Sequence, residues 1–211
     1  MKPKALRYAR KGILMHAKSI RWILEGRKTQ TRRIIKQAIC FGSQEGVPLR
    51  VNGLTPLKCP YGQPGDRLYV KETWREPGSC QMPDNTIPSF MTQRDVIYRA
   101  DDEVVDGPWR SSMFMPRRFS RLTLEITNIR VERVQDIEPE GCIAEGIDLD
   151  KHKCGCDFCA TSLIVCPTTA SSLAMEFADL WDATNGKGAW ERNDGVWVVE
   201  FKKCEDSRED L

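Results

Sequence analysis

The sequence is poor in the features that mark membrane, secreted and repetitive proteins. It has no uninterrupted apolar run near the roughly 18–20 residues of a membrane-spanning helix. The N-terminal stretch lacks the apolar core of a secretory signal, and its early arginines make a mitochondrial leader the weaker alternative. Internal repeats and low-complexity tracts are absent from the sequence. We therefore expect a cytoplasmic globular protein with no membrane partner.

Histidine is also scarce, because His16 and His152 are its only two copies. A catalytic metal centre needs about three protein ligands and an open position. Outside one cysteine-rich stretch, the chain offers only His16 for such a site. We therefore expect neither a catalytic metal nor an organic cofactor.

Charge is balanced overall but distributed unevenly along the chain. The 211 residues include 32 Lys and Arg and 30 Asp and Glu, which gives a formal net charge of +2. Residues 1–36 hold twelve Lys and Arg with Glu25 as their only acid, so this segment carries +11 and the remainder carries −9. Such a split favours a basic face that meets an anion, most often nucleic acid. A solvated charged surface is the alternative interpretation.

Apolar spacing along the chain predicts mixed secondary structure in what we expect to be one domain of 211 residues. Alternating apolar residues predict strands over 28–35, 67–74, 95–100, 121–134 and 196–203. Helical spacing predicts helices over 19–24, 139–145 and 171–183. Irregular composition marks insertions at about 36–60, 75–93 and 148–168. Because helices do not regularly separate the strands, we predict an α+β fold with a curved mixed sheet or small β-barrel and short flanking helices.

One segment combines cations with hydroxyl and amide groups at strand spacing. In extended form, the run GRKTQTRR directs Lys28, Gln30 and Arg32 to one side. The other side receives Thr29, Thr31 and Arg33. Both sides pair positive charge with neutral hydrogen-bonding groups, which suits a phosphate or a polar heterocycle. A charged edge strand has the same composition, so the pattern alone leaves both interpretations open.

Two further motifs accompany this segment. The run PGDRL is a tight turn that leads into a strand. The run AEG places Glu145 on the last turn of a short helix, where a carboxylate opposes the helix dipole. Such a position is unfavourable unless a cation or a ligand compensates it, although exposed glutamates also occur there.

Together these motifs resemble the ASCH domain, a relative of the PUA fold, and in particular the larger ASCH-like proteins encoded by phages and prophages. The resemblance covers nearly the whole chain apart from the first dozen residues and the cysteine-rich insertion. It is carried by the runs ILEGRKTQTRR, CPYGQPGDRLYVKETW, YRAD, MPRRFSRLTLEITNIRVERVQDI, AEGI and LWDATNGK.

The resemblance implies a PUA-like domain that binds RNA, DNA or a modified nucleoside in the cytoplasm of a bacterial host. A more distant similarity to a bacterial N4-acetylcytidine amidohydrolase places its functional Lys, Thr and Glu on Lys28, Thr31 and Glu145. One departure is Gly146, which stands where that enzyme has Asn. A phage morphogenesis or host-interaction protein, with a protein partner, is a further alternative.

The hydrolytic alternative assigns a role to each of these three residues. The Thr31 hydroxyl is a weak nucleophile and needs a base. Lys28 can be that base if burial or nearby cations lower its pKa, and Glu145 can pass a proton to the leaving amine. The structural alternatives are a phosphate contact for Lys28, a strand position for Thr31 and an ion pair for Glu145.

Other residues are candidates for ligand contacts around the same cleft. Arginine and threonine side chains would contact phosphate, and tryptophans would stack on a base for roughly 1–3 kcal/mol each. Burial of a tryptophan in the core is the alternative for either one. The candidates are Arg27, Thr29, Arg32, Arg33, Trp74, Trp109, Arg117 and Arg118.

The cysteine-rich stretch offers a possible metal site. Cys154, Cys156, Cys159 and Cys166 lie within thirteen residues, with His152 just before them as a substitute ligand. Thiolates at such spacing can enclose one Zn²⁺ ion tetrahedrally. The stretch has few apolar residues, so a metal would help to order it. We predict structural zinc here, distinct from the chemistry of the cleft.

Overall fold

The computed structural model describes residues 11–36, 50–51, 55–56, 58–76, 91, 95–101, 108–155 and 166–204. The chain forms two compact units, each assembled from separated segments. The first unit comprises Met1–Gly26, Gln63–Thr127 and Phe201–Leu211. The second unit comprises Arg27–Gly62 and Asn128–Glu200. Much of each predicted insertion, at 36–60, 75–93 and 148–168, lies outside the described residues.

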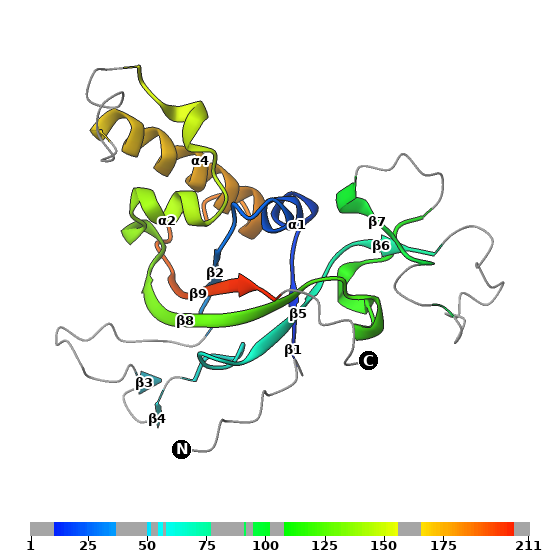
Figure 1. Ribbon diagram of the computed structural model, residues 1–211. Helices are drawn as coiled ribbons and strands as arrows, with labels where there is room; N and C mark the ends of the chain where they lie inside the picture. Colours follow the sequence, from blue (N-terminus) through cyan, green and yellow to red (C-terminus); the bar gives the residue numbers. More distant parts are fainter. Residues whose placement is uncertain are drawn as a thin grey trace. The chain divides into compact units, whose positions relative to one another are not determined.

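The first unit is built on β1 (Lys11–Leu14), β5 (Arg67–Lys71) and the start of β8 (Thr123–Arg133) (Figure 1). β1 runs parallel to β5, and β5 runs antiparallel to β8. Gly12 lies opposite Tyr69, and a Cβ at Gly12 would come within 2.8 Å of the tyrosine ring. Because β1 lies within residues 1–36, part of the basic N-terminal segment forms a strand of the sheet.

Aromatic packing forms a core in the first unit. β6 (Trp74–Arg75) pairs antiparallel with β7 (Ile97–Tyr98). Trp74 is fully buried, and its ring centroid lies 5.0 Å from that of Phe119. α1 (Ala17–Leu24) also belongs to this unit, as do the 3₁₀ turns η3 (Arg99–Asp101), η4 (Ser112–Phe114) and η5 (Arg117–Phe119).

The second unit packs helices against β2 (Gln30–Ile34) and β9 (Gly195–Lys203), which run antiparallel. Its core joins Cys142 of α2 (Pro139–Ala144), Phe177 of α4 (Pro167–Asn185) and Val198 of β9. The 3₁₀ turns η6 (Val134–Asp136) and η7 (Leu149–His152) complete the connections. Leu173, Phe177 and Trp181 are the buried apolar residues of α4, whereas Leu180 is half-buried and Thr184 is exposed.

The strands form a mixed five-stranded sheet with the order β1-β5-β8-β9-β2. β3 (Arg50–Val51) pairs with β4 (Thr55–Pro56) in a separate small sheet. The predicted α+β class is confirmed. The predicted small barrel is not formed, because the end strands β1 and β2 are not paired with each other in the described part of the chain. α4 spans 19 residues and is longer than the short flanking helices predicted.

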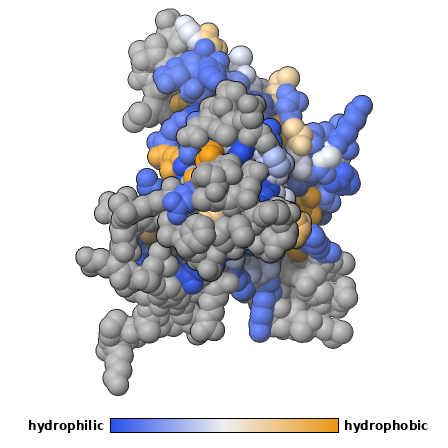
Figure 2. Space-filling model, turned by 90° about the vertical axis from the view of Figure 1, so that its right-hand side faces the viewer, coloured by the Kyte–Doolittle hydropathy of each residue, from blue (hydrophilic) through white to orange (hydrophobic). Residues whose placement is uncertain are grey.

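The boundaries of several elements differ from the sequence prediction. α1 begins at Ala17 with His16 at its N-cap, so Ser19 lies within the helix. The strand predicted over 95–100 shortens to β7 followed by η3. In the described ranges, no helix has the length and apolar character required to cross a membrane. Most described residues visible in Figure 2 are hydrophilic, and apolar ones occur there in small groups.

Candidate functional site

The segment that leads into β2 is bound to the C-terminal end of α2. Lys28 Nζ donates to the backbone carbonyl of Glu145 at 2.9 Å. The backbone N–H of Thr29 donates to the backbone carbonyl of Ala144, also at 2.9 Å. The last carbonyls of a helix lack intrahelical partners and carry partial negative charge. The Lys28 ammonium therefore both satisfies and electrostatically stabilises this helix end.

Lys28 and Arg32 share the carboxylate of Glu145. Lys28 Nζ contacts Glu145 Oε2, and Arg32 Nη1 donates to Glu145 Oε1 at 3.2 Å. The three residues are 4%, 5% and 4% exposed. Glu145 thus has the compensating cations that its position at a helix C-terminus requires. We call Lys28, Arg32 and Glu145 the buried charge cluster.

Burial changes the acidity of the lysine in this cluster. Removal from water lowers the pKa of Lys28 below its ordinary value of 10.5, because burial penalises the ammonium form. The carboxylate of Glu145 opposes this shift, and the cations Arg32 and Arg33 add to it. A depressed lysine pKa is the property that the hydrolytic alternative needs from its base.

Arg32 extends the buried charge cluster toward an open pocket. Its Nε and Nη2 donate to Glu132 Oε1 at 2.8 and 2.6 Å, and its Nη1 donates to Gln30 Oε1 at 3.0 Å. The pocket has a volume of about 470 Å³ and belongs entirely to the second unit. Its lining residues are Gln30, Arg32, Arg130, Glu132, Asp136, Glu138, Glu140, Gly141, Ala144 and Glu200.

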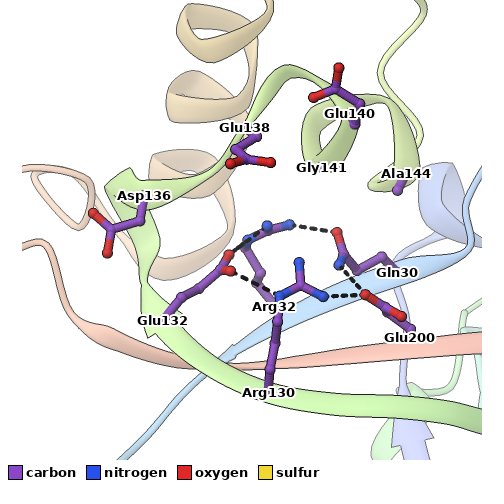
Figure 3. Close-up of a pocket in the computed structure, with 10 residues that line it drawn as sticks. All are labelled: Gln30, Arg32, Arg130, Glu132, Asp136, Glu138, Glu140, Gly141, Ala144 and Glu200. Carbon is purple, nitrogen blue, oxygen red and sulfur yellow. Dashed lines mark hydrogen bonds and ion pairs between the residues drawn. The ribbon is translucent and has the colours of Figure 1, made fainter. Parts of the chain in front are cut away.

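The close-up in Figure 3 shows how the strands and the α2 region form the two sides of this pocket. Arg32 lies at its centre, between Glu132 on one side and Gln30 on the other. Gln30 Nε2 donates to Glu200 Oε1 at 3.3 Å, because the two residues face each other across β2 and β9. Glu138 points toward the guanidinium of Arg32, whereas the Glu140 carboxylate points away.

Gly141 permits α2 to approach Arg32 closely. A Cβ at this position would lie 2.9 Å from Arg32 Nη2 and 3.0 Å from Ile137 Cγ1. Such separations are shorter than normal contacts, and the hydrogen bonds of Arg32 limit how far its guanidinium can move. Because Gly141 has no side chain, α2 can lie this close to Arg32 and form this wall of the pocket.

The charge of the pocket differs from the basic cleft expected from the sequence. Two guanidiniums and five carboxylates line it, so its formal charge is −3 when all of them are ionised. Arg32 was predicted as a site residue and Gln30 as a neutral group beside it, whereas Arg130, Glu132 and Glu200 were not predicted to line the site. The alternation of side chains along a strand could have indicated these residues. Arg130 and Glu132 are two residues apart and so lie on one side of their strand, and Gln30 lies on the same side of its strand as Arg32.

The structure brings Lys28 and Glu145 together, but neither lines the pocket. Thr31 is 4% exposed and pairs with Val199 on β9, on the strand side opposite Gln30 and Arg32. Arg33 is half-buried, and burial lowers its pKa while Tyr61 and Glu145 raise it. Convergence of Lys28, Thr31 and Glu145 on one substrate stays a prediction.

The other predicted contacts divide between the two units. In the second unit, Arg27 is exposed and its Nη1 donates to the carbonyl of Gly146 at 3.4 Å. Trp74 belongs to the first unit and is fully buried, so it is core and not an exposed stacking surface. Trp109 is half-buried, and Arg117 and Arg118 are exposed, all within the first unit.

Two of the predicted metal ligands lie close together. Cys154 Sγ and Cys166 Sγ are 3.3 Å apart, whereas Cys156 and Cys159 lie outside the described residues. His152 is bound elsewhere, because Nδ1 lies 2.6 Å from Ser172 Oγ and Nε2 lies 2.5 Å from Glu176 Oε2. Among the residues that the structure describes, no three or more His, Cys, Asp or Glu are grouped to hold a metal.

Comparisons of the chain with protein-family models, curated proteins and solved structures find no match. The resemblance to the ASCH domain therefore stays a prediction from the sequence motifs. What the site can bind must be argued from its own geometry.

Proposed function

We propose that this protein recognises a nucleobase, either in a modified nucleoside or in a nucleic-acid strand, and that the pocket beside Arg32 receives it. The observation that carries the proposal is the polar lining of this pocket over a buried, hydrogen-bonded arginine. Its volume of about 470 Å³ lies within the range of about 300–1,000 Å³ typical of small-molecule sites. The ASCH-like motifs favour the same class of ligand.

The hydrogen-bonding groups of the pocket match the edge of a base. A carboxylate accepts from the exocyclic amine of cytosine, and a guanidinium donates to a carbonyl or ring nitrogen. Glu200 and Arg130, which pair with each other on neighbouring strands, offer these two groups through their remaining oxygen and N–H atoms, and Gln30 Nε2 has a second N–H beyond the one that Glu200 accepts. A small ligand that both donates and accepts hydrogen bonds can therefore be satisfied within the pocket.

The negative charge of the pocket restricts which part of a nucleotide it receives. Five carboxylates around a phosphate would repel it, since two like charges about 4 Å apart cost about 1 kcal/mol even in water. A neutral or cationic base does not meet this repulsion. We therefore propose that the base enters the pocket and that any phosphate remains outside it.

Isothermal titration calorimetry tests this proposal with cytidine, N4-acetylcytidine and their 5′-monophosphates. We expect at least one nucleoside to bind more tightly than its monophosphate, and Glu200→Gln to weaken binding by about tenfold through loss of a charged acceptor. Glu125→Gln is the matched control, because Glu125 is a strand glutamate of the first unit that pairs with Lys202. Absence of nucleoside binding at millimolar concentration would refute the proposal.

A second candidate function is removal of an acyl group from N4-acetylcytidine or a related base. The contact between Lys28 and Glu145 and the lowered pKa of Lys28 favour it. In this reaction the Thr31 oxygen attacks the acyl carbonyl while neutral Lys28 takes its proton. Glu145 passes a proton to the departing amine, and water then releases the acyl group from Thr31.

Chromatographic detection of cytidine released from N4-acetylcytidine tests this alternative. We expect turnover to be lost in Thr31→Val, which keeps the β-branched shape but lacks the hydroxyl, and to persist in Thr29→Val. Turnover should rise with pH through the lowered pKa of Lys28. Release of no cytidine by the folded protein would eliminate the reaction and leave the binding proposal standing.

A further inference from the structure

The carboxylates that line the pocket beside Arg32 fall into two groups. The first group has arginine partners inside the pocket. Glu132 accepts from Arg32 and pairs with Arg130, and Glu200 also pairs with Arg130. The two guanidiniums and these two carboxylates therefore balance each other in formal charge.

The second group of carboxylates has no cationic partner. It consists of Asp136, Glu138 and Glu140, which are exposed and lie just before α2 or in its first turn. Asp136 accepts the backbone N–H of Arg133 at 3.4 Å. Among the residues that the structure describes, none of the three acids forms an ion pair. We call Asp136, Glu138 and Glu140 the acidic rim, and the charge of −3 in the pocket is the charge of this rim.

The nearby start of α2 compensates the acidic rim only in part. The N-terminus of a helix stabilises acids through a partial charge of about half a unit, whereas the rim carries three full charges. Like charges gathered at one place oppose the compact state. A cation that enters the pocket would relieve this repulsion.

Glu138 is the member of the acidic rim that is directed at the centre of the pocket. Figure 3 shows its carboxylate pointing toward the guanidinium of Arg32, whereas the carboxylate of Glu140 points away. In the described part of the chain, the hydrogen bonds of Arg32 go to three other side chains, and none goes to Glu138. The oxygens of Glu138 can therefore accept from a ligand.

We propose that the base received by this pocket carries a positive charge, as a base methylated on a ring nitrogen does. This inference rests on the proposed function and specifies its ligand class. The acidic rim would attract a cationic ring, and an exocyclic amine on that ring would donate to Glu138 or Glu200. A neutral base would gain the hydrogen bonds without this attraction.

Calorimetric titration of the full-length protein with 3-methylcytidine and 5-methylcytidine tests the inference. Both nucleosides carry one methyl group more than cytidine, but 3-methylcytidine is cationic at neutral pH and 5-methylcytidine is neutral. At low ionic strength we expect 3-methylcytidine to bind about tenfold more tightly. At about 0.5 M salt most of this preference should be lost, because salt screens the exposed carboxylates of the rim.

Three substitutions locate the source of the preference. Glu138→Gln removes one charge with little change of shape and should reduce the preference about fivefold. Glu140→Gln removes the same charge from a carboxylate that points away, so it should reduce the preference less. Glu125→Gln, in the first unit, is the control and should leave the preference intact.

The outcomes separate this inference from the proposed function on which it rests. Equal affinity for cytidine and both methylated nucleosides would overturn the charge preference and leave base recognition standing. Binding of no nucleoside would overturn both. A preference for 3-methylcytidine that survives both Glu138→Gln and high salt would overturn the role of the acidic rim. Choline, a cation without a ring, would overturn the ligand class if it bound as tightly as 3-methylcytidine.

Discussion

Both units bury glutamates beside arginines, but they surround them differently. In the first unit, Glu72 is 1% exposed and accepts from Nε and Nη2 of Arg121 at 2.9 Å each. Arg121 also donates to Asp101 and stacks 4.1 Å from the ring of Tyr98. Glu76 has an equivalent partner in Arg110, which lies over Trp74. These charges are enclosed by their own partners and by the aromatic core.

The buried charge cluster of the second unit is no less buried, but it adjoins a pocket. Glu145 has two cations, Lys28 and Arg32, and Arg32 continues the network into the lining of the pocket. In both networks, removal of one partner would leave an uncompensated buried charge. The network of the second unit also reaches a polar pocket, and this is where we propose that a ligand binds.

The largest expected effect comes from Glu145→Gln. This change leaves buried Arg32 with Glu132 as its carboxylate partner and buried Lys28 with only the backbone carbonyl of residue 145. Breaking a buried ion pair costs about 3–5 kcal/mol. Urea denaturation should show a loss of that size in the free energy of unfolding. The exposed Glu138→Gln, at the rim of the same pocket, should change it by less than about 0.5 kcal/mol. Equal effects of the two variants would contradict the comparison.

Gly141→Ala tests the close approach of α2 to Arg32. In an unconstrained helix this change would stabilise the protein by up to about 1 kcal/mol. Here the added methyl would lie 2.9 Å from Arg32 Nη2, so we expect a net loss of about 1–3 kcal/mol. Thermal denaturation shows whether the variant is more or less stable than the wild type. Glu140→Ala, an exposed neighbour in the same helix, is the control and should be close to neutral.

The contribution of Glu72 to the stability of the first unit should depend on pH. Burial raises the pKa of Glu72 above its ordinary value of 4.5, so the folded state retains a proton that the unfolded chain has already released. The stability that this group contributes is present below about pH 4.5 and is lost as the pH rises through the raised pKa.

Glu72→Gln should therefore remove this pH dependence. The free energy of unfolding of the wild type, relative to Glu72→Gln, should fall between mildly acid and neutral pH. Denaturation of both proteins across this range measures the difference. A relative stability that instead increases toward neutral pH would show that Arg121 outweighs the burial of Glu72.

The smallest expected effect on stability is that of Arg130→Gln. Arg130 is 40% exposed and pairs with Glu132 and Glu200 at the edge of the pocket. Ion pairs of this exposure contribute about 0–1 kcal/mol, and their contribution is screened by salt. The variant should therefore unfold nearly as the wild type does, while nucleoside binding weakens because a donor to the base is lost. Unchanged binding would remove Arg130 from the proposed contacts.

Local patterns in the sequence predicted the elements better than their assembly. The alternating run that forms β8 and the apolar stripe of α4 were visible, because burial of one side imposes a period on the residues. β1 was missed, since its four residues lie within the charge-rich residues 1–36 and pair with β5, more than fifty residues away. The pairing of two strands that are distant in the chain produces no recognisable pattern in the sequence of one four-residue strand.

The site was predicted in part for the same reason. The motif residues Lys28 and Glu145 were identified, and they do meet although 117 positions separate them. The acidic lining was not foreseen, because it arises when the fold brings Glu200 of β9 and the run from Glu132 to Glu140 around Arg32 of β2. Charge counted along the chain describes the composition of a segment, whereas charge in a pocket depends on which segments the fold brings together.

Four of the five N–H groups of Arg32 are already engaged, two by Glu132 and one each by Gln30 and Glu145. The Arg32 side chain is only 1% exposed, and its guanidinium also lies 5.6 Å from the centroid of the Phe177 ring. Arg32 therefore leaves little of its own surface for an incoming molecule and instead holds the neighbouring Glu132 and Gln30 side chains in place. The entropy of immobilising these two side chains is lost during folding, so little of it has to be lost again on binding. The pocket should consequently favour ligands whose hydrogen-bonding groups match an arrangement that is already fixed.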